Sequence, residues 1–237
     1  MVFSEKVLIL RTGRFKEYDL WVRFLSPTRG ILTGFAFGGC RSRRRFCGCL
    51  DSLNLVIFTI NAGSRRKYLT LEEGTLINGF STLKARRDNL GVAANCIRFV
   101  QKICLEGDDS SAVYSLMLES LLLLDNQARV PAFFPLLFKA KATFMHGYEP
   151  LLNSCSRCGL LLSKIEYPSF LFDSGRVVCS DCVHNSDKGF KARPKSLMFL
   201  DRLRLTRPED WIFWNPEKEV LQDCFRMVDA YVQYHLE

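Results

Sequence analysis

The first third of the chain alternates short apolar runs with turn-forming residues. The runs are rich in β-branched and aromatic side chains and cover residues 7–10, 20–25, 31–37, 53–60, 68–71 and 75–77. Turn-forming pairs such as Thr12 with Gly13 and Glu73 with Gly74 separate them. Five or six strands at this spacing predict a small closed barrel or sandwich over residues 1–80.

The hydrophobic period changes after residue 80. Apolar positions then recur at the three- and four-residue spacing of a helix, which predicts helices over 83–105, 112–124, 133–145, 196–205 and 217–236. Residues 151–192 lose this period. We therefore expect a multidomain α+β chain in which a barrel (1–80) precedes an all-α domain (81–150 and 193–237) that is interrupted by a small insert (151–192).

Two cysteine pairs lie in the predicted insert. Cys155 and Cys158, followed by Gly159, are separated by twenty residues from Cys179 and Cys182. This spacing is typical of a zinc site, because two residues between cysteines allow both thiolates to reach one tetrahedral ion. A segment with little core of its own also gains stability from a bound metal. We predict one structural Zn²⁺ per chain, held by these four cysteines.

Other interpretations of the cysteines compete with this one. Two redox C-x-x-C pairs would need a βαβ context that the pattern lacks, and a catalytic zinc would keep one coordination position open. His184 is close enough to replace a ligand, although an exposed loop histidine is the simpler interpretation. We expect the remaining cysteines to pack as small apolar side chains: Cys40, Cys47, Cys49, Cys96, Cys104 and Cys224.

The charge of the chain is concentrated in the predicted barrel. The 237 residues carry a formal net charge of +8, and residues 1–80 hold 13 Lys and Arg against six Asp and Glu. A basic region of this kind is expected to meet a polyanion. No apolar run is long enough for an export signal or a membrane span, so we expect a cytosolic protein without a membrane partner.

The basic residues form two clusters between predicted strands. Arg41, Arg43, Arg44 and Arg45 follow Gly38 and Gly39, and a second cluster is formed by Arg65, Arg66 and Lys67. Phe35, Phe37 and Phe46 lie nearby in sequence, and arginines beside aromatic rings are the usual means of binding single-stranded nucleic acid. The alternative is a solvated charged hairpin with the phenylalanines in the core.

No pattern typical of a catalytic site occurs in the chain. We find no H-x-x-x-H pair, no G-x-S-x-G motif and no Walker loop, so we expect no catalytic residues and no enzyme activity. Lys139 and Lys141 on the third predicted helix are a candidate second basic patch, with a solvated helix face as the alternative.

The order of these features resembles the RecO family of bacterial recombination mediators. The resemblance rests on Gly147-Tyr148-Glu149-Pro150-Leu151 before the first cysteine pair, on residues 7–11 and 18–26, and on the basic turn after Gly38. It implies an OB-fold in the barrel. It also implies a cytoplasmic, nucleoid-associated protein that binds single- and double-stranded DNA, anneals complementary strands and helps to load recombinase on DNA coated by single-stranded-DNA-binding protein.

The resemblance further implies two protein partners: RecR and the acidic tail of the single-stranded-DNA-binding protein. The predicted DNA-binding residues are Arg11, Arg14, Arg23, Arg41, Arg43, Arg44, Arg45, Arg65, Arg66 and Lys67. Two other classes stay open: a zinc-ribbon enzyme acting on nucleic acid, and an RNA-binding protein of translation or the ribosome.

Overall fold

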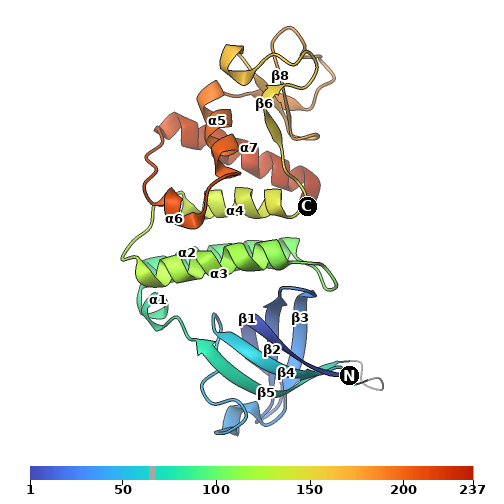
Figure 1. Ribbon diagram of the computed structural model, residues 1–237, viewed down its shortest axis with the longest axis vertical. Coiled ribbons are helices and arrows are strands. Elements are labelled where there is room, and N and C mark those ends of the chain that lie inside the picture. Colours follow the sequence, from blue (N-terminus) through green and yellow to red (C-terminus); the bar gives the residue numbers. More distant parts are fainter. Residues whose placement is uncertain (64–67, 237) are drawn as a thin grey trace. The chain divides into compact units, whose positions relative to one another are not determined.

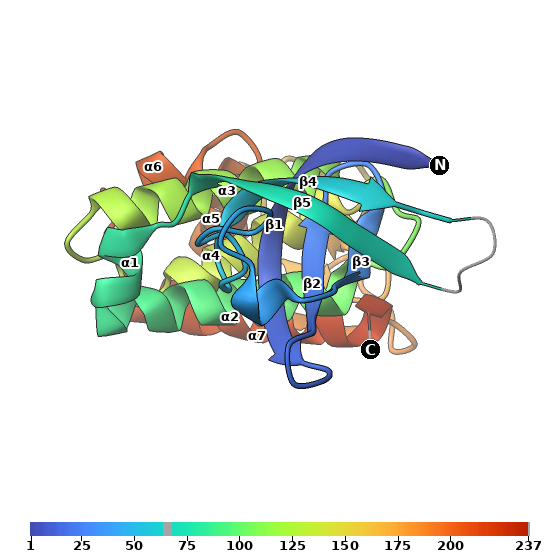
Figure 2. The ribbon, with the colours of Figure 1, turned by 90° about the horizontal axis from the view of Figure 1, so that it is seen from below.

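A computed structural model describes residues 1–63 and 68–236 (Figures 1 and 2). The chain forms two compact units, Met1–Arg129 and Val130–Glu237. These units are larger groupings than the four predicted segments, whose boundaries stay a prediction.

The first unit begins with a closed five-stranded barrel. Its strands follow the order β1-β2-β3-β5-β4, and β1 also pairs with β4. All pairs are antiparallel except β3 with β5. This Greek-key arrangement is the OB-fold, so the predicted α+β class with a barrel at the N-terminus is confirmed. The strands are β1 (Val2–Arg14), β2 (Leu20–Ser26), β3 (Gly30–Ala36), β4 (Leu55–Asn61) and β5 (Leu69–Asn78), with a 3-10 turn, η1 (Gly39–Arg41), after β3.

Alternation along the strands fills the barrel interior. Val22 and Phe24 of β2 point inward and pack in one cluster with Val7, Ile9 and Phe58. Phe24 and Phe58 meet edge to face, with ring centroids 5.8 Å apart. Because neighbouring positions on a strand point to opposite faces, Trp21, Arg23 and Leu25 of β2 point outward.

Two predicted turns are instead parts of strands. Gly13 lies in β1, and a Cβ atom at this position would lie 2.5 Å from the Trp21 ring of β2. Gly74 lies in β5 and pairs with Phe58, so the two runs at 68–71 and 75–77 form one strand. The prediction was wrong here because both glycines allow a close approach of a neighbouring side chain and do not reverse the chain.

The described part of the first unit is completed by the helices α1 (Ser81–Ala85), α2 (Arg87–Ile103) and α3 (Ser111–Asn126). The predicted helix 83–105 is broken at Arg86, whose backbone is extended. The Arg86 side chain donates to the carbonyl oxygens of Asp125 and Gln127, and Asn89 donates to those of Leu124 and Gln127. The break therefore places polar side chains against the end of α3.

The loop between α2 and α3 is bonded to the β2–β3 hairpin. Ile31 N donates to the Leu105 carbonyl, and Gly107 N donates to the Arg29 carbonyl. Next to these contacts, four apolar residues that are paired across neighbouring strands point to the outside of the barrel. Each of them is at most 5% exposed. We call Ile31, Leu25, Leu8 and Leu55 the outer row.

The second unit contains four further helices around the predicted insert. The helices are α4 (Phe134–Met145), α5 (Pro194–Leu203), α6 (Pro208–Trp211) and α7 (Lys218–Leu236). The insert forms a small sheet of order β6-β8-β7-β9, made of β6 (Leu151–Cys155), β7 (Ser169–Leu171), β8 (Arg176–Val178) and β9 (Gly189–Lys191), with a 3-10 turn, η2 (Leu162–Lys164). The short helix α6 was not predicted. It buries Trp211 against Phe134 of α4, with ring centroids 5.2 Å apart.

Lys139 and Lys141 do not form a second basic patch. Lys139 pairs with Asp229 at 2.7 Å. Lys141 is buried, and its Nζ donates to the carbonyl oxygens of Leu203 (3.0 Å) and Arg204 (2.5 Å) at the end of α5. A lysine in this position satisfies helix C-terminal carbonyls, so it is part of the packing.

Within the described part of the chain, no helix is both long enough and apolar enough to cross a membrane.

Candidate nucleic-acid interface and metal centre

Aromatic side chains gather on the outer surface of the barrel. We call Phe15, Phe35, Phe37 and Tyr68 the aromatic patch. The ring centroid of Phe35 lies 5.1 Å from that of Phe15, 5.3 Å from Tyr68 and 6.4 Å from Phe37. Phe15 is 52% exposed and Tyr68 is 43% exposed. Phe15 lies in the loop between β1 and β2, and Tyr68 immediately precedes β5, so the patch borders the surface that OB-folds use for oligonucleotides.

Cationic side chains lie beside the aromatic patch on β1 and β2. The strand register pairs Arg11 with Arg23, and one step further along the sheet it pairs Trp21 with Phe35. Both arginines are exposed, and the Arg11 guanidinium lies over the Trp21 ring at 5.8 Å. Charge and stacking surface therefore occupy adjacent rows of one sheet face.

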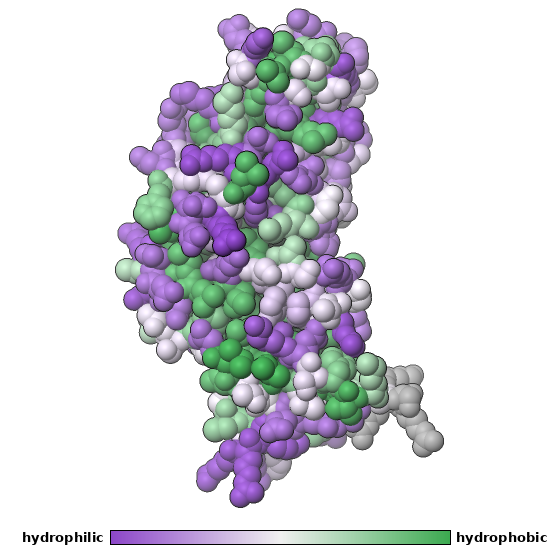
Figure 3. Space-filling model, viewed as in Figure 1, coloured by the Kyte–Doolittle hydropathy of each residue, from purple (hydrophilic) through white to green (hydrophobic). Residues whose placement is uncertain are grey.

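The basic segment 39–45 is attached next to this face. Cys40 N donates to the Tyr18 carbonyl at 3.1 Å, and the Arg41 guanidinium stacks on the Tyr18 ring at 3.4 Å. Arg45 Nη2 donates to the Phe37 carbonyl at 2.7 Å, which connects the segment to the aromatic patch. Figure 3 shows hydrophilic side chains gathered at this end of the barrel.

The predicted arginines have different surroundings. Arg43 and Arg44 are exposed, and among the described residues neither has a hydrogen-bonding or ionic partner through its side chain. Arg41 and Arg45 are held by the contacts given above. Arg14 is exposed at the end of β1. Arg65, Arg66 and Lys67 lie outside the described residues.

Several residue-level expectations for this region were wrong or incomplete. Phe46 is 3% exposed and packs in the barrel core, as the alternative interpretation held. Cys40 and Cys47 are exposed, whereas Cys49, Cys96, Cys104 and Cys224 are buried as expected. Sequence reasoning missed Phe15, Tyr18, Trp21 and Tyr68. These residues could have been found as candidates because they are aromatic and belong to a basic predicted barrel.

A groove of about 440 Å³ lies against the aromatic patch. Phe35 and Tyr68 form part of its wall, together with Thr33, Leu69, Ala62, Gly63 and Glu106. All of these residues belong to the first unit. The volume falls within the range of small-ligand sites.

The four predicted metal ligands are brought together in the second unit. Cys155 ends β6, Cys158 follows in a turn, and Cys179 and Cys182 follow β8. Their sulfur atoms all lie within 4.8 Å of one another, and Cys158 Sγ lies 3.8 Å from Cys179 Sγ. Four sulfurs bound tetrahedrally to Zn²⁺ would be separated by about 3.8 Å, so the donor set and its spacing fit this ion.

The electrostatics of the cluster also fit a cation. Burial raises the pKa of the Cys155 thiol, but the backbone N–H groups of Cys158, Cys179 and Arg157 outweigh it and lower the pKa to about 6. Hydrogen bonds with the sulfurs of Cys179 and Cys158 raise the pKa of Cys182 to about 12. Four thiolates in this space repel one another, and a divalent cation would remove that repulsion.

An ion pair closes the loop beside the cysteines. Arg157 binds Asp187 through two hydrogen bonds, of 2.8 and 2.6 Å, and also donates to the Cys182 carbonyl. The Asp187 carboxylate accepts the His184 backbone N–H at 2.7 Å. The His184 side chain is exposed and is not part of the cysteine cluster, as the simpler interpretation predicted.

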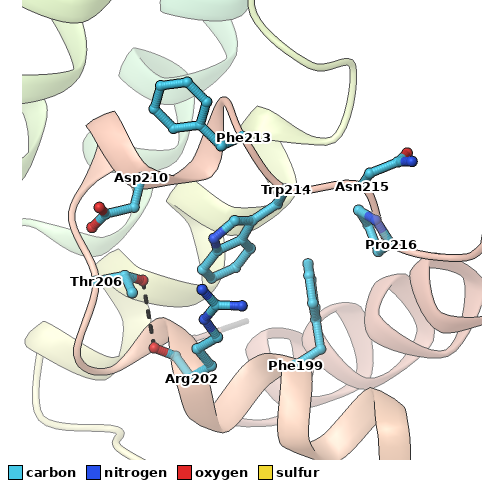
Figure 4. Close-up of a pocket in the computed structure, with 8 residues that line it drawn as sticks. All are labelled: Phe199, Arg202, Thr206, Asp210, Phe213, Trp214, Asn215 and Pro216. Atoms are coloured by element: carbon cyan, nitrogen blue, oxygen red, sulfur yellow. Dashed lines mark hydrogen bonds between the residues drawn. The ribbon is translucent and has the colours of Figure 1, made fainter.

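The second unit also contains a recess of about 420 Å³ between α5 and the segment before α7 (Figure 4). Phe199 and Trp214 meet edge to face with ring centroids 4.9 Å apart, and the Arg202 guanidinium lies 5.0 Å from the Trp214 ring. Figure 4 shows the Arg202 side chain extending toward that ring. Phe213, at the rim, is 83% exposed.

The fold and the two sites define a class: an OB-fold protein with a helical part that carries a four-cysteine centre. Comparison with protein families finds one family model over the barrel and a second over the rest of the chain. Residues 1–80 match the family described as Recombination protein O N terminal, and residues 85–237 match Recombination protein O C terminal. The chain belongs to the RecO family of DNA repair proteins.

Full-length relatives agree with the family models. The DNA repair protein RecO of Oleidesulfovibrio alaskensis is 44% identical over 239 residues, which cover 100% of this chain and 95% of that protein. The proteins of the same name from Maridesulfovibrio salexigens and Lawsonia intracellularis are 39% and 34% identical, with the same coverage of both chains.

Proposed function

We propose that this chain is a non-enzymatic mediator of DNA repair and homologous recombination. In this proposal it binds single- and double-stranded DNA, anneals complementary strands and helps to load recombinase on DNA coated by single-stranded-DNA-binding protein. The observation that carries the proposal is the outer face of β1, β2 and β3, where the aromatic patch lies beside Arg11, Arg23 and the basic segment.

The proposed activity needs no bond chemistry. Arginines such as Arg43 and Arg44 would neutralise phosphates, release counterions and reduce the repulsion between two strands held at one surface. Exposed rings such as Phe15 would stack on unpaired bases, which are accessible only in single strands. The arginines would therefore contribute to binding of both single- and double-stranded DNA, whereas the aromatic patch would favour single strands.

The test compares two double variants of the full-length protein. R43A/R44A removes two exposed charges from the basic segment, and R87A/R98A removes two exposed charges from α2 as a matched control. We expect R43A/R44A to bind both DNA forms more weakly, to anneal complementary oligonucleotides more slowly, and to reduce the slope of log K against log salt by about 1 to 1.5 on single strands.

The control should retain the affinity and the slope of the unmodified protein. Equal slopes and affinities for R43A/R44A and the unmodified protein would exclude the basic segment from DNA binding. The variant F15A adds a second criterion, because loss of one stacking ring should weaken single-strand binding by about 1–3 kcal/mol and leave duplex binding nearly unchanged.

We also propose RecR and the acidic tail of single-stranded-DNA-binding protein as partners, and Zn²⁺ as the structural metal. Support for the tail comes from the recess around Arg202, because a guanidinium against aromatic walls suits a carboxylate beside an apolar side chain. The variant R202E should abolish capture of the acidic peptide. Undiminished capture would place the tail elsewhere.

A further inference from the structure

Glu106 introduces a carboxylate into the groove beside the aromatic patch. The other wall residues are apolar, aromatic or hydroxyl-bearing, and Glu106 is the one charged residue among the groove-lining residues that the structure describes. Within the described chain, its carboxylate has neither a hydrogen bond nor an ion pair. An acceptor without a partner therefore lies at the edge of a groove that is lined by Phe35 and Tyr68.

The backbone around Glu106 is held against the barrel. Glu106 forms an isolated bridge with Gly30, at the start of β3. A Cβ atom on Gly30 would lie 1.7 Å from the Leu105 carbonyl oxygen, and Gly30 adopts φ +67°, so only glycine fits this contact. The Leu105 backbone N–H donates to Asp108 Oδ2 at 2.8 Å, which stabilises the same loop. Glu106 is thus placed relative to Thr33 and Phe35 by the fold.

The chemistry of the groove suits a base better than a phosphate. The Glu106 carboxylate in the groove wall repels a phosphate. The rings of Phe35 and Tyr68 offer stacking surface to a planar base. A carboxylate only accepts hydrogen bonds, so it pairs with the amino groups of cytosine, adenine or guanine. Thymine presents a carbonyl oxygen where cytosine has its amino group, so it offers the carboxylate only the single N3–H.

We propose that this groove holds one unpaired base of single-stranded DNA and that Glu106 makes it prefer amino-bearing bases to thymine. This inference rests on the proposed function, because it assumes that DNA lies on this face of the barrel. In a duplex the same amino groups are paired, so the groove also excludes double-stranded DNA. Glu106 is a specificity-determining residue in this arrangement.

The test uses two pyrimidine oligonucleotides, so that stacking area stays nearly constant. Binding of fluorescent oligo-dC and oligo-dT, about 12 nucleotides long, is measured by anisotropy at a slightly alkaline pH that keeps cytosine unprotonated. We expect the full-length protein to bind oligo-dC at least about fivefold more tightly than oligo-dT. E106Q should reduce this ratio to about twofold or less, since an amide both donates and accepts.

The variant E73Q is the matched control, because it removes the same charge from an exposed position on β5. It should retain the full dC preference, and thermal unfolding should show that both variants are folded. Binding of both oligonucleotides without preference would overturn the inference and leave the proposed function intact. Failure to bind either would contradict the proposed function itself. If E106Q increased the affinity for both oligonucleotides equally, Glu106 would act only by repelling the DNA phosphates. This result would also overturn the inference.

Discussion

Gly74 lies in the middle of β5, where the end of the basic segment contacts this strand. Its backbone N–H donates to the Arg45 carbonyl at 2.8 Å. A Cβ atom at this position would lie 2.7 Å from Cys49 Sγ and 2.7 Å from the Phe58 ring. The absence of a side chain therefore allows residues 45–49 to pack closely on the strand, and it fixes the end of the arginine-rich segment.

We expect Gly74→Ala to destabilise the protein by about 1–3 kcal/mol, because the added methyl group would overpack a closed site. The measurement is urea unfolding followed by circular dichroism. Gly91→Ala is the control: Gly91 is exposed in α2 and a Cβ atom there meets nothing within 4 Å, so this change should stabilise the helix by about 0.5–1 kcal/mol. Equal effects of the two substitutions would contradict the packing argument.

Residue type alone does not separate the roles of the four clustered arginines. Arg41 stacks on the Tyr18 ring and Arg45 donates to the Phe37 carbonyl, whereas Arg43 and Arg44 are exposed. The sequence predicted a cationic cluster correctly but could not assign these roles, because the position of Arg41 depends on Tyr18 of the loop between β1 and β2, which is distant in sequence. The four clustered cysteines were predictable individually, since the spacing within each pair is local.

At the scale of elements, Asp223 connects α7 to the start of α5 through hydrogen bonds and an ion pair. Its carboxylate accepts the Arg193 backbone N–H at 3.2 Å and the Ser196 hydroxyl at 3.1 Å, and it pairs with the Arg193 guanidinium at 2.8 Å. Burial raises the pKa of Asp223, but the hydrogen bonds from Arg193 and Ser196 outweigh this and lower it below its usual value. The ionised carboxylate is therefore the form that the fold stabilises.

Asp223→Asn should lower the free energy of unfolding by about 1–2 kcal/mol at pH 7 through weaker hydrogen bonds. The pKa of Asp223 is lower in the folded state than in the unfolded state. The stability that its ionised carboxylate contributes is therefore fully present above the unfolded pKa of about 4. This stability is lost as the pH falls through the folded-state pKa. The difference in free energy of unfolding between Asp223→Asn and the unmodified protein should therefore shrink below about pH 4. Urea unfolding across this pH range measures it.

The exposed carboxylate of Asp229 provides the comparison for Asp223. It lies on the same helix and pairs with Lys139, and its side chain is 62% exposed. Asp229→Asn should change stability by less than about 0.5 kcal/mol. A difference between Asp223→Asn and the unmodified protein that stays constant from neutral to strongly acidic pH would refute the linkage.

Periodicity predicted elements well where packing follows one face of the sheet or helix. The bounds of β2 and β3 differ from the predicted runs by about one residue. Periodicity failed where a single contact decides the structure. The four-residue helix α6 depends on burial of Trp211, and the break at Arg86 depends on carbonyl groups at the end of α3. Neither contact leaves a repeating pattern in the sequence.

At the scale of the whole molecule, the two candidate sites belong to different units. The proposed DNA face lies within Met1–Arg129, and the cysteine cluster lies within Val130–Glu237. Loss of the proposed Zn²⁺ should therefore affect folding of the insert far more than DNA binding.

We expect the double variant C155S/C182S to contain no zinc and to show rapid hydrogen exchange across residues 151–192, because the small sheet there has little core of its own. Its affinity for single-stranded DNA should remain within about twofold of the unmodified protein. Cys47→Ser, which changes an exposed cysteine outside the cluster, is the control. Metal analysis of the unmodified protein should give one zinc per chain; a value far below one would reject the metal assignment.

The outer row has a practical consequence for anyone dividing this chain into fragments. Ile31, Leu25, Leu8 and Leu55 face away from the barrel interior, yet almost none of their surface is exposed. A fragment that ends at residue 80 keeps all five strands but leaves this row bare, and a contiguous apolar strip on a small barrel promotes self-association. A fragment that ends at residue 129 also keeps α3, which contacts β2 on the barrel. The smallest piece suited to isolated study of the DNA face is therefore longer than the barrel itself.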